Sequence, residues 1–218
     1  MNLDWYQENK VSPDYSIGVD EVGRGPLAGP VVAAAVWISL ELAIRLKDSD
    51  ELIVRDSKKM TKLQREKVVN WMQQQHPELL RYSVGQATVE EIDRLNILNA
   101  ALLAMERAYN FLGIHKKYVL VDGNRTPDLK NTETSAVVRG DDKVLSISLA
   151  SIVAKEHRDA IMRKLAIEHP HYGWETNVGY GSQQHLQAIL MHGITRHHRK
   201  TFCKAIKRRI ASFFANHN

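Results

Sequence analysis

Short apolar runs and longer amphipathic stretches alternate along this chain. Residues 31–38 are almost wholly apolar, which is typical of a buried strand, and the shorter segment 16–20 also has the pattern of a strand. Residues 82–87, 117–121 and 136–138 are further short β-rich runs. These five segments are predicted to be strands.

Helical periodicity marks the longer stretches, which are residues 61–75, 88–112, 146–169, 182–191 and 204–214. Two of them open with capping-box spacing, Thr61 with Gln64 and Thr88 with Glu91, and Pro170 closes a third. Because strands and helices alternate through the middle of the chain, we expect an α/β sheet with helices packed on it. The C-terminal part is predicted to be helical.

Composition places the chain among ordinary globular proteins. Its 218 residues, 44% hydrophobic and 25% charged, fit one domain with a helical appendage. Cys203 is the single cysteine, which excludes an internal disulfide and a cysteine-built zinc site. No apolar run is long enough to span a membrane, and residues 1–14 contain no apolar signal core. We therefore expect a cytoplasmic protein without a membrane partner, and a monomer needs no further assumption.

Charge is distributed unevenly along the chain. The net charge is +5, but the last acidic residue is Glu175, and residues 176–218 carry seven basic side chains. The first 175 residues are thus slightly acidic. We predict a division into a core over residues 1–175 and a basic, helical extension over 176–218, whose charge favours nucleic acid as the partner. A solvated basic helix face is the alternative interpretation.

The segment from Gly18 to Val31 carries the most distinctive chemistry. Asp20 and Glu21 are adjacent carboxylates, and Gly23-Arg24-Gly25 follows them at once. Carboxylates attract divalent cations, whereas an arginine on a glycine-rich backbone attracts phosphate. The pattern favours a site that holds a metal against a phosphodiester. An acidic strand end followed by a tight glycine turn would give the same sequence.

Further carboxylates follow predicted strands. Asp122 follows residues 117–121, and Asp141 follows residues 136–138, so both are expected at the sheet edge where active sites gather. Converging carboxylates need a cation, and oxygen ligands select Mg²⁺ or Mn²⁺ over zinc. Adjacent strand residues point to opposite faces, so Asp20 and Glu21 can share a metal only at a strand end or bulge. Turn chemistry at Asp122-Gly123 and Asp142 as the fourth ligand stay open alternatives.

The order of the motifs resembles that of the type 2 ribonucleases H, the ribonuclease HII family. The matching elements are Gly23-Arg24-Gly25 with the preceding carboxylates, Asp56-Ser57-Lys58-Lys59, Val121-Asp122-Gly123, Arg139-Gly140-Asp141, the segment from Ser146 to Asp159, Gly179-Tyr180-Gly181 with His185, and His198-Arg199-Lys200-Thr201-Phe202. The resemblance covers residues 16–202. It implies a ribonuclease H-like mixed sheet flanked by helices.

The resemblance also implies the roles of particular residues. Asp20, Glu21, Asp122 and Asp141 would be the catalytic metal ligands. Gly23-Arg24-Gly25 and Tyr180 would recognise a ribose 2′-OH, and Lys58 would contact the phosphate. The implied enzyme is a Mg²⁺- or Mn²⁺-dependent endoribonuclease acting on RNA–DNA hybrids and on single ribonucleotides in duplex DNA.

Two other classes remain as alternatives. A structure-specific DNA junction nuclease could use the same core, but a ribose-reading glycine, arginine and tyrosine set would have little use there. A non-enzymatic nucleic-acid-binding protein fits the basic tail, yet it gains nothing from carboxylates that face phosphates.

The remaining features have simpler interpretations. The ten histidines contain no HxxxH or HExxH spacing, which argues against a histidine-bound zinc. His185 is expected to be a structural hydrogen bonder, and the charged residues of 155–159 to pair along their helix. Residues 210–214 could contact a replication clamp, although an amphipathic helix end explains them better.

Overall fold

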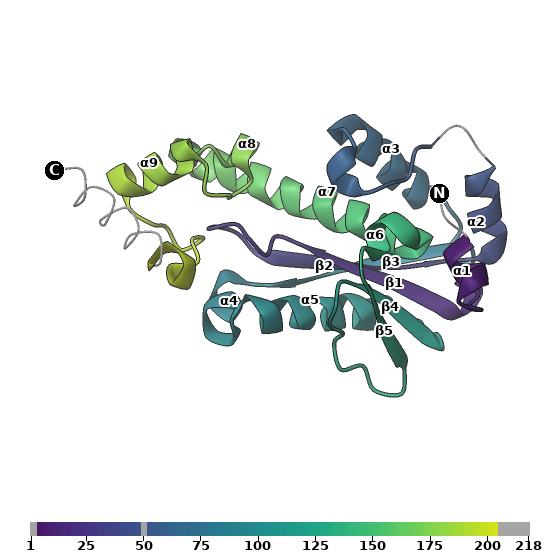
Figure 1. Ribbon diagram of the computed structural model, residues 1–218. Coiled ribbons are helices and arrows are strands. Elements are labelled where there is room, and N and C mark those ends of the chain that lie inside the picture. The colour runs from purple at the N-terminus through teal and green to yellow at the C-terminus, as the bar shows by residue number, and fades with distance from the viewer. Residues whose placement is uncertain (1–3, 49–51, 205–218) are drawn as a thin grey trace.

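A five-stranded mixed sheet forms the centre of this computed structural model, in which residues 4–48 and 52–204 are described (Figure 1). Its strands are β1 (Ser16–Val22), β2 (Val31–Ile38), β3 (Leu80–Ala87), β4 (Tyr118–Asp122) and β5 (Glu133–Val137). They lie in the order β3-β2-β1-β4-β5. The first three strands are antiparallel neighbours, whereas β4 and β5 run parallel to β1. The five predicted strands are therefore confirmed, with β2 matching residue for residue, whereas β5 begins three residues before the predicted segment 136–138 and ends one residue earlier.

Helices cover both faces of the sheet, as the alternation predicted (Figure 1). The long α7 (Leu145–Glu168) packs on β1 and β2 on one face, where α2 (Leu40–Lys47) and α3 (Lys62–Gln73) also lie. On the other face α5 (Ile97–Phe111) packs on β2 and β3, next to α4 (Val89–Leu95). Every residue of β2 is buried because its alternate side chains enter both hydrophobic clusters.

Two glycines allow the helices to approach the strands. A Cβ on Gly18 of β1 would lie 2.3 Å from the backbone carbon of Ser146, at the start of α7. A Cβ on Gly85 of β3 would lie 2.3 Å from the carbonyl oxygen of Ala104 in α5. Since backbone cannot yield cheaply at such distances, any side chain here would push the helix layer away from the sheet.

The single helix predicted over residues 88–112 is wrong, because the chain breaks at Asn96 into α4 and α5. Asn96 has a φ of 65°, which interrupts the helical backbone. Its side-chain oxygen accepts hydrogen bonds from the backbone N–H groups of Leu98 (3.0 Å) and Asn99 (3.2 Å). Asn96 therefore begins a second helix within one continuous hydrophobic pattern.

Several short elements carry too few residues for periodicity to show. They are α1 (Asp4–Glu8), η1 (Pro13–Tyr15), η2 (Ser57–Lys59), α6 (Gly140–Lys143), η3 (Pro170–Tyr172) and α8 (Trp174–Asn177). The predicted helix over residues 182–191 corresponds to α9 (Gln183–His192). The one predicted over 204–214 lies almost wholly outside the described residues.

A third hydrophobic cluster lies at the far end of α7. It joins Leu27 and Ala28 to Met162 and Trp174, and also to Ile189 of α9. The described residues before and after position 175 thus share one cluster. The division into a core of 1–175 and an extension of 176–218 stays a prediction.

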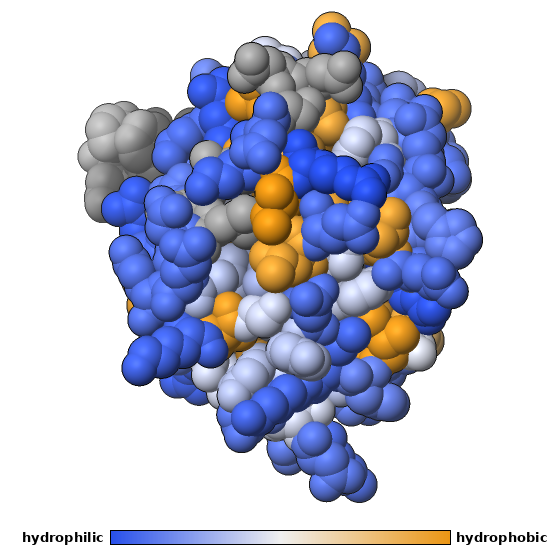
Figure 2. Space-filling model, turned by 90° about the vertical axis from the view of Figure 1, so that its right-hand side faces the viewer, coloured by the Kyte–Doolittle hydropathy of each residue, from blue (hydrophilic) through white to orange (hydrophobic). Residues whose placement is uncertain are grey.

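The exposed surface is mixed in character. The face that includes the ends of α1 and α2 is largely hydrophilic, with small separated hydrophobic patches (Figure 2). Among the described helices, none combines the length and the apolar content that crossing a membrane would require.

Glu91 is expected to stabilise the fold in a pH-dependent way. Its carboxylate accepts from both terminal nitrogens of Arg107, at 2.8 and 2.7 Å, and it closes the capping box of α4. The Arg107 hydrogen bond lowers the pKa of Glu91 to about 2, below its usual value of 4.5. This stabilisation is fully present above pH 4.5 and is lost as the pH falls towards 2.

We therefore expect Glu91→Gln to lower the free energy of unfolding by about 1 kcal/mol at pH 7 and by progressively less at pH 4 and 3. Urea denaturation at the three pH values measures the difference, with Glu106→Gln on the exposed side of α5 as the control. A difference that is constant with pH would contradict the assignment.

Candidate active site

Asp20 and Asp122 lie side by side because β1 and β4 are parallel and in register. Val19 pairs with Val121, so the next residue on each strand is one of the two aspartates. Both valines face the cluster under α5, and the aspartates therefore face α7. Asp20 is 5% exposed.

Asp141 is brought to the same place by a turn that Asp122 itself anchors. An Asp122 carboxylate oxygen accepts from the backbone N–H of Gly140 at 2.7 Å and of Asp141 at 3.4 Å. Arg139 begins α6 with a left-handed φ of 57°. A Cβ on Gly140 would lie 2.6 Å from the Cδ1 methyl of Ile147, so a side chain here would require Ile147 to shift.

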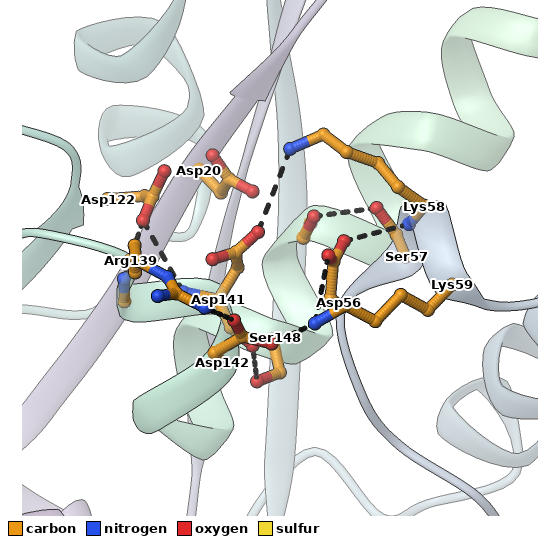
Figure 3. Close-up of polar contacts among 12 residues, drawn as sticks. Asp20, Asp56, Ser57, Lys58, Lys59, Asp122, Arg139, Asp141, Asp142 and Ser148 are labelled. Carbon is orange, nitrogen blue, oxygen red and sulfur yellow. Dashed lines mark hydrogen bonds and ion pairs between the residues drawn. The ribbon is translucent and has the colours of Figure 1, made fainter.

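The Asp56-Ser57-Lys58-Lys59 element supplies the cation of the site. The Nζ of Lys58 lies 3.8 Å from an Asp141 carboxylate oxygen (Figure 3). The Asp56 side chain accepts from the Lys58 backbone N–H at 2.9 Å, and the Ser57 and Ser151 hydroxyls are 2.9 Å apart. These contacts hold η2 against α7, so Lys58 points at the carboxylates.

Asp142 points away from this group of carboxylates. It forms ion pairs with Lys59 (3.1 Å) and Arg139 (3.0 Å), and its hydrogen bonds to them lower its pKa (Figure 3). Of the two adjacent aspartates, Asp141 is the one beside Asp122 and Lys58.

Glu21 is placed differently from the other three carboxylates. The strand was expected to end at Asp20, but β1 continues regularly to Val22. Asp20 pairs with Ala34, on the α7 side, whereas Glu21 pairs with Ala33, on the α5 side. The Glu21 carboxylate forms an ion pair with Arg24 at 3.2 Å. Glu21 is still close enough to influence Asp20 electrostatically.

The electrostatics of the site favour a bound cation. Burial, followed by the charges of Glu21 and Asp122, raises the pKa of Asp20 well above its usual value. Burial and then Asp122 raise the pKa of Asp141. Burial alone would lower the pKa of Lys58, but Asp141, Asp56, Asp20 and Asp122 together raise it. Carboxylate oxygens that destabilise one another's charge fit a hard divalent cation such as Mg²⁺ or Mn²⁺.

These carboxylates surround a wider space than one tight ligand shell. In the described part of the chain, the group of three or more His, Cys, Asp or Glu side chains with ligand atoms all within 4.8 Å lies elsewhere, at the end of α7.

The predicted ribose-reading residues also lie together. A Cβ on Gly25 would lie 3.5 Å from Cε1 of Tyr180, so the loop and the tyrosine are in contact range. Tyr180 is 46% exposed and the Arg24 side chain 54%, which leaves both open to a ligand. The backbone N–H of Leu27 donates to the Gly179 carbonyl at 2.8 Å and ties the two segments together.

Two buried arginines hold this loop, and the sequence analysis missed both. Arg199 donates to the carbonyls of Gly23 (2.6 Å), Arg24 and Gly29 (both 3.0 Å). Arg158 donates to the carbonyls of Ala28, Pro30 and Val178. Burial lowers their pKa values, to about 9 for Arg199 and about 10 for Arg158, which leaves both charged at neutral pH.

This placement corrects two predictions. Arg158 was expected to pair along its helix, as Lys155 does with Asp159 at 2.7 Å, but it contacts the loop instead. Arg199 was counted in the basic tail, yet it is fully buried and unavailable to a polyanion. Arg196, Lys200 and Lys204 are exposed, and Lys207, Arg208 and Arg209 lie outside the described residues.

His185 is a structural hydrogen bonder, as predicted. Its Nδ1 lies 2.8 Å from the Tyr180 carbonyl and therefore carries the proton. Its Nε2 accepts from the Trp174 indole at 3.0 Å and lies 3.1 Å from Nε2 of His198. The Nδ1 of His198 accepts from the Thr195 N–H, so the His198 Nε2 donates. This buried chain of donors fixes the backbone at Tyr180.

The sheet order and the acidic group at the ends of β1 and β4 define a nuclease of the ribonuclease H-like class. The crystal structure of ribonuclease H2 from Pyrococcus horikoshii OT3 matches with a TM-score of 0.71 and 29% identity, over 89% of this chain and 97% of that one. The RNase HII in the PCNA:RNase HII complex from Archaeoglobus fulgidus shares the fold, with a TM-score of 0.65 and 22% identity over 85% and 94% of the two chains.

Sequence comparison identifies the family within this class. The ribonuclease HII family model matches residues 17–205. The ribonuclease HII of Pelagibacter ubique is 48% identical over 185 residues, which cover 85% of this chain and 94% of that protein. The chain belongs to the ribonuclease HII family, and it is a metal-dependent endoribonuclease of the ribonuclease H type.

Proposed function

We propose that this enzyme hydrolyses the RNA strand of RNA–DNA hybrids and also cuts on the 5′ side of single ribonucleotides embedded in duplex DNA. The products would be 3′-OH and 5′-phosphate ends. The observation that carries the proposal is the convergence of Asp20, Asp122 and Asp141 with Lys58 at one sheet edge. Removal of ribonucleotides during DNA replication and repair, in the cytoplasm, is the corresponding cellular role.

Asp20, Glu21, Asp122 and Asp141 are proposed as the catalytic residues that hold two Mg²⁺ or Mn²⁺ ions. When bound, such ions supply an activated water and stabilise the leaving 3′ oxygen. Glu21 already acts electrostatically on Asp20 and Asp122, and only its Oε1 contacts Arg24, so Oε2 is the oxygen we propose as a metal ligand. Lys58 offers a point charge to the phosphate at the cut, since its Nζ is exposed beside Asp141.

Recognition of the ribose is assigned to the loop Gly23-Arg24-Gly25 and to Tyr180. The 2′-OH distinguishes RNA from DNA, and glycines allow backbone groups to approach a sugar. The contact range between Gly25 and Tyr180 supports a shared surface for one sugar. The exposed Arg196, Lys200 and Lys204 supply charge for the phosphate backbone.

We further propose that the enzyme acts as a monomer. The Archaeoglobus fulgidus relative was solved with PCNA, and clamp binding by residues 210–214 remains a weaker proposal here. Those residues lie outside the described part of the chain.

The test uses labelled duplexes of one sequence: all DNA, DNA with one ribonucleotide, and an RNA–DNA hybrid. Each is incubated with Mg²⁺, Mn²⁺ or EDTA, and the product ends are mapped. We expect metal-dependent cutting of the hybrid and cutting 5′ of the single ribonucleotide. Equal cutting of the all-DNA duplex would favour a junction nuclease, and binding without cutting would leave only a nucleic-acid-binding protein.

A variant pair tests the ribose assignment separately. Tyr180→Ala is expected to reduce kcat/KM on the single-ribonucleotide duplex by about 10²-fold, a loss of about 3 kcal/mol of transition-state stabilisation. Tyr15→Ala, at another exposed tyrosine, is the control. An equal effect of the two substitutions would contradict the role of Tyr180.

A further inference from the structure

A second group of metal-ligating side chains lies at the opposite end of α7 from Asp141. Glu168, His169 and His197 each offer one ligand atom, and these atoms all lie within 4.8 Å of one another. Asp141 precedes α7, and Glu168 is its last residue, so the 24-residue helix separates the two places by about 35 Å. This group therefore belongs to no part of the carboxylate site.

The ligand types select a different ion from the one proposed at the carboxylates. Two imidazoles and one carboxylate suit borderline transition ions such as Zn²⁺, whereas Mg²⁺ prefers oxygen ligands alone. The spacing of these residues along the chain does not indicate a metal site. Glu168 and His169 are adjacent, and His197 is distant in sequence, so no HxxxH or HExxH pattern arises.

The backbone on both sides of this group is already fixed. The His169 N–H donates to the Leu165 carbonyl at 2.9 Å as the C-cap of α7. The His197 N–H donates to the Thr195 hydroxyl at 3.1 Å, and the His197 carbonyl accepts from Gly29 at 2.9 Å. An ion would thus bind a preformed pair of segments rather than order a loose one.

Aromatic neighbours orient the two imidazole rings. The His169 and His197 rings lie 5.4 Å apart, and Trp174 packs edge-on against both, at 5.5 and 6.4 Å. Trp174 is fully buried. Contact with the buried Trp174 ring therefore restricts both imidazoles and keeps their nitrogens near Glu168.

A groove of about 390 Å³ adjoins the group at His197, and Glu90 and Arg196 also line it. Arg196 Nε donates to Nε2 of His197 at 3.2 Å, so an exposed positive charge lies beside one of the three ligand residues. From the same groove, Glu90 acts electrostatically on His197.

We propose that Glu168, His169 and His197 bind one Zn²⁺ or similar borderline ion, which links the end of α7 to the turn before Arg199. Such a link would stabilise the segment that holds the Gly23–Pro30 loop, because Gly29 is hydrogen-bonded to His197 and Arg199 to Gly29. The proposal does not depend on the activity assigned to the carboxylates.

The test is calorimetric titration of the chelator-treated full-length protein with Zn²⁺, with excess Mg²⁺ present to occupy the carboxylates. We expect one site, and a Kd raised at least about tenfold by Glu168→Gln, His169→Gln or His197→Gln. Zn²⁺ at about a hundredfold excess over its Kd should raise Tm by about 5 °C. Arg196→Ala should tighten binding, because it removes a positive charge that lies beside His197.

The controls separate this site from other histidines and from the carboxylates. His171 and His192 stack at 4.4 Å on the same end of the molecule, so His171→Gln and His192→Gln should leave Zn²⁺ affinity unchanged. Asp122→Asn should leave it unchanged as well. Glu168 is exposed, so Glu168→Gln tests the ligand without disturbing the fold. Unchanged affinity in all three ligand variants, or loss of binding in Asp122→Asn, would overturn the proposal.

Discussion

Asp122→Asn is expected to reduce kcat on the hybrid by on the order of 10³-fold, about 4 kcal/mol of activation free energy. The change removes a charge and little else. The asparagine oxygen still accepts from Gly140 and Asp141, so the turn that positions Asp141 persists. Asp122 is also the carboxylate whose charge acts on both Asp20 and Asp141.

Stability should not fall with activity in this variant. Burial raises the pKa of Asp20 and of Asp141, and the charge of Asp122 raises both further. The three carboxylate charges therefore destabilise one another in the fold. Removing one of them relieves this repulsion. We expect an unchanged or slightly higher Tm without added metal, and a smaller rise in Tm on adding Mn²⁺ than wild type shows.

Asp142→Asn is the matched control. Asp142 is adjacent to Asp141 but pairs with Lys59 and Arg139, away from the carboxylate group. Its kcat should stay within about threefold of wild type, since exposed ion pairs contribute little. Equal losses in the two variants would mean that net charge, and not the position of Asp122, governs the reaction.

The central sheet could be predicted because its information is local. The apolar run that forms β2 and the capping boxes at Thr61 and Thr88 each lie within a few neighbouring residues. The placement of Asp122 followed from strand ends meeting at one sheet edge, and the register of β1 and β4 explains why it meets Asp20. The helix break at Asn96 was not predicted, because the apolar stripe continues across it while the capping side chain of Asn96 begins a new helix.

What the sequence could not reveal depends on contacts between distant segments. Strand alternation predicts that the side chains of Asp20 and Glu21 point to opposite faces if the strand continues. Only the pairing of Asp20 with Ala34 and of Glu21 with Ala33 shows that β1 stays regular there. A buried arginine looks the same in sequence as an exposed one. Arg199 lies in a basic run, and its burial follows from carbonyl acceptors some 170 residues earlier. His169 and His197 meet for the same kind of reason.

The loop contacts of Arg199 predict a large loss of stability on truncation. In Arg199→Met the carbonyls of Gly23 and Gly29, which accept in buried contacts, and the part-buried carbonyl of Arg24 all lose a charged donor. Each buried acceptor left unpaired costs about 1–3 kcal/mol. We expect the free energy of unfolding to fall by about 3–5 kcal/mol and Tm by roughly 10 °C.

Arg199 should also affect substrate binding in a way that general destabilisation does not. It touches the backbone of Gly23 and Arg24, but none of the carboxylates. Measured well below Tm, Arg199→Met should raise KM for the single-ribonucleotide duplex about tenfold and change kcat less than about threefold. Arg199→Lys keeps the charge without the planar fork that reaches several carbonyls, so it should lie between wild type and Arg199→Met.

Lys164→Met, at an exposed cation of α7, is the control for loss of a positive charge. Thermal melts and steady-state kinetics on the three duplexes give both readouts. A fall in kcat without a rise in KM would place the effect at the carboxylates, against this argument. Arg158 binds the neighbouring carbonyls of Ala28 and Pro30, so both arginines hold the same loop. In the double variant Arg158→Met/Arg199→Met, the free energy of unfolding should therefore fall by less than the sum of the two single losses.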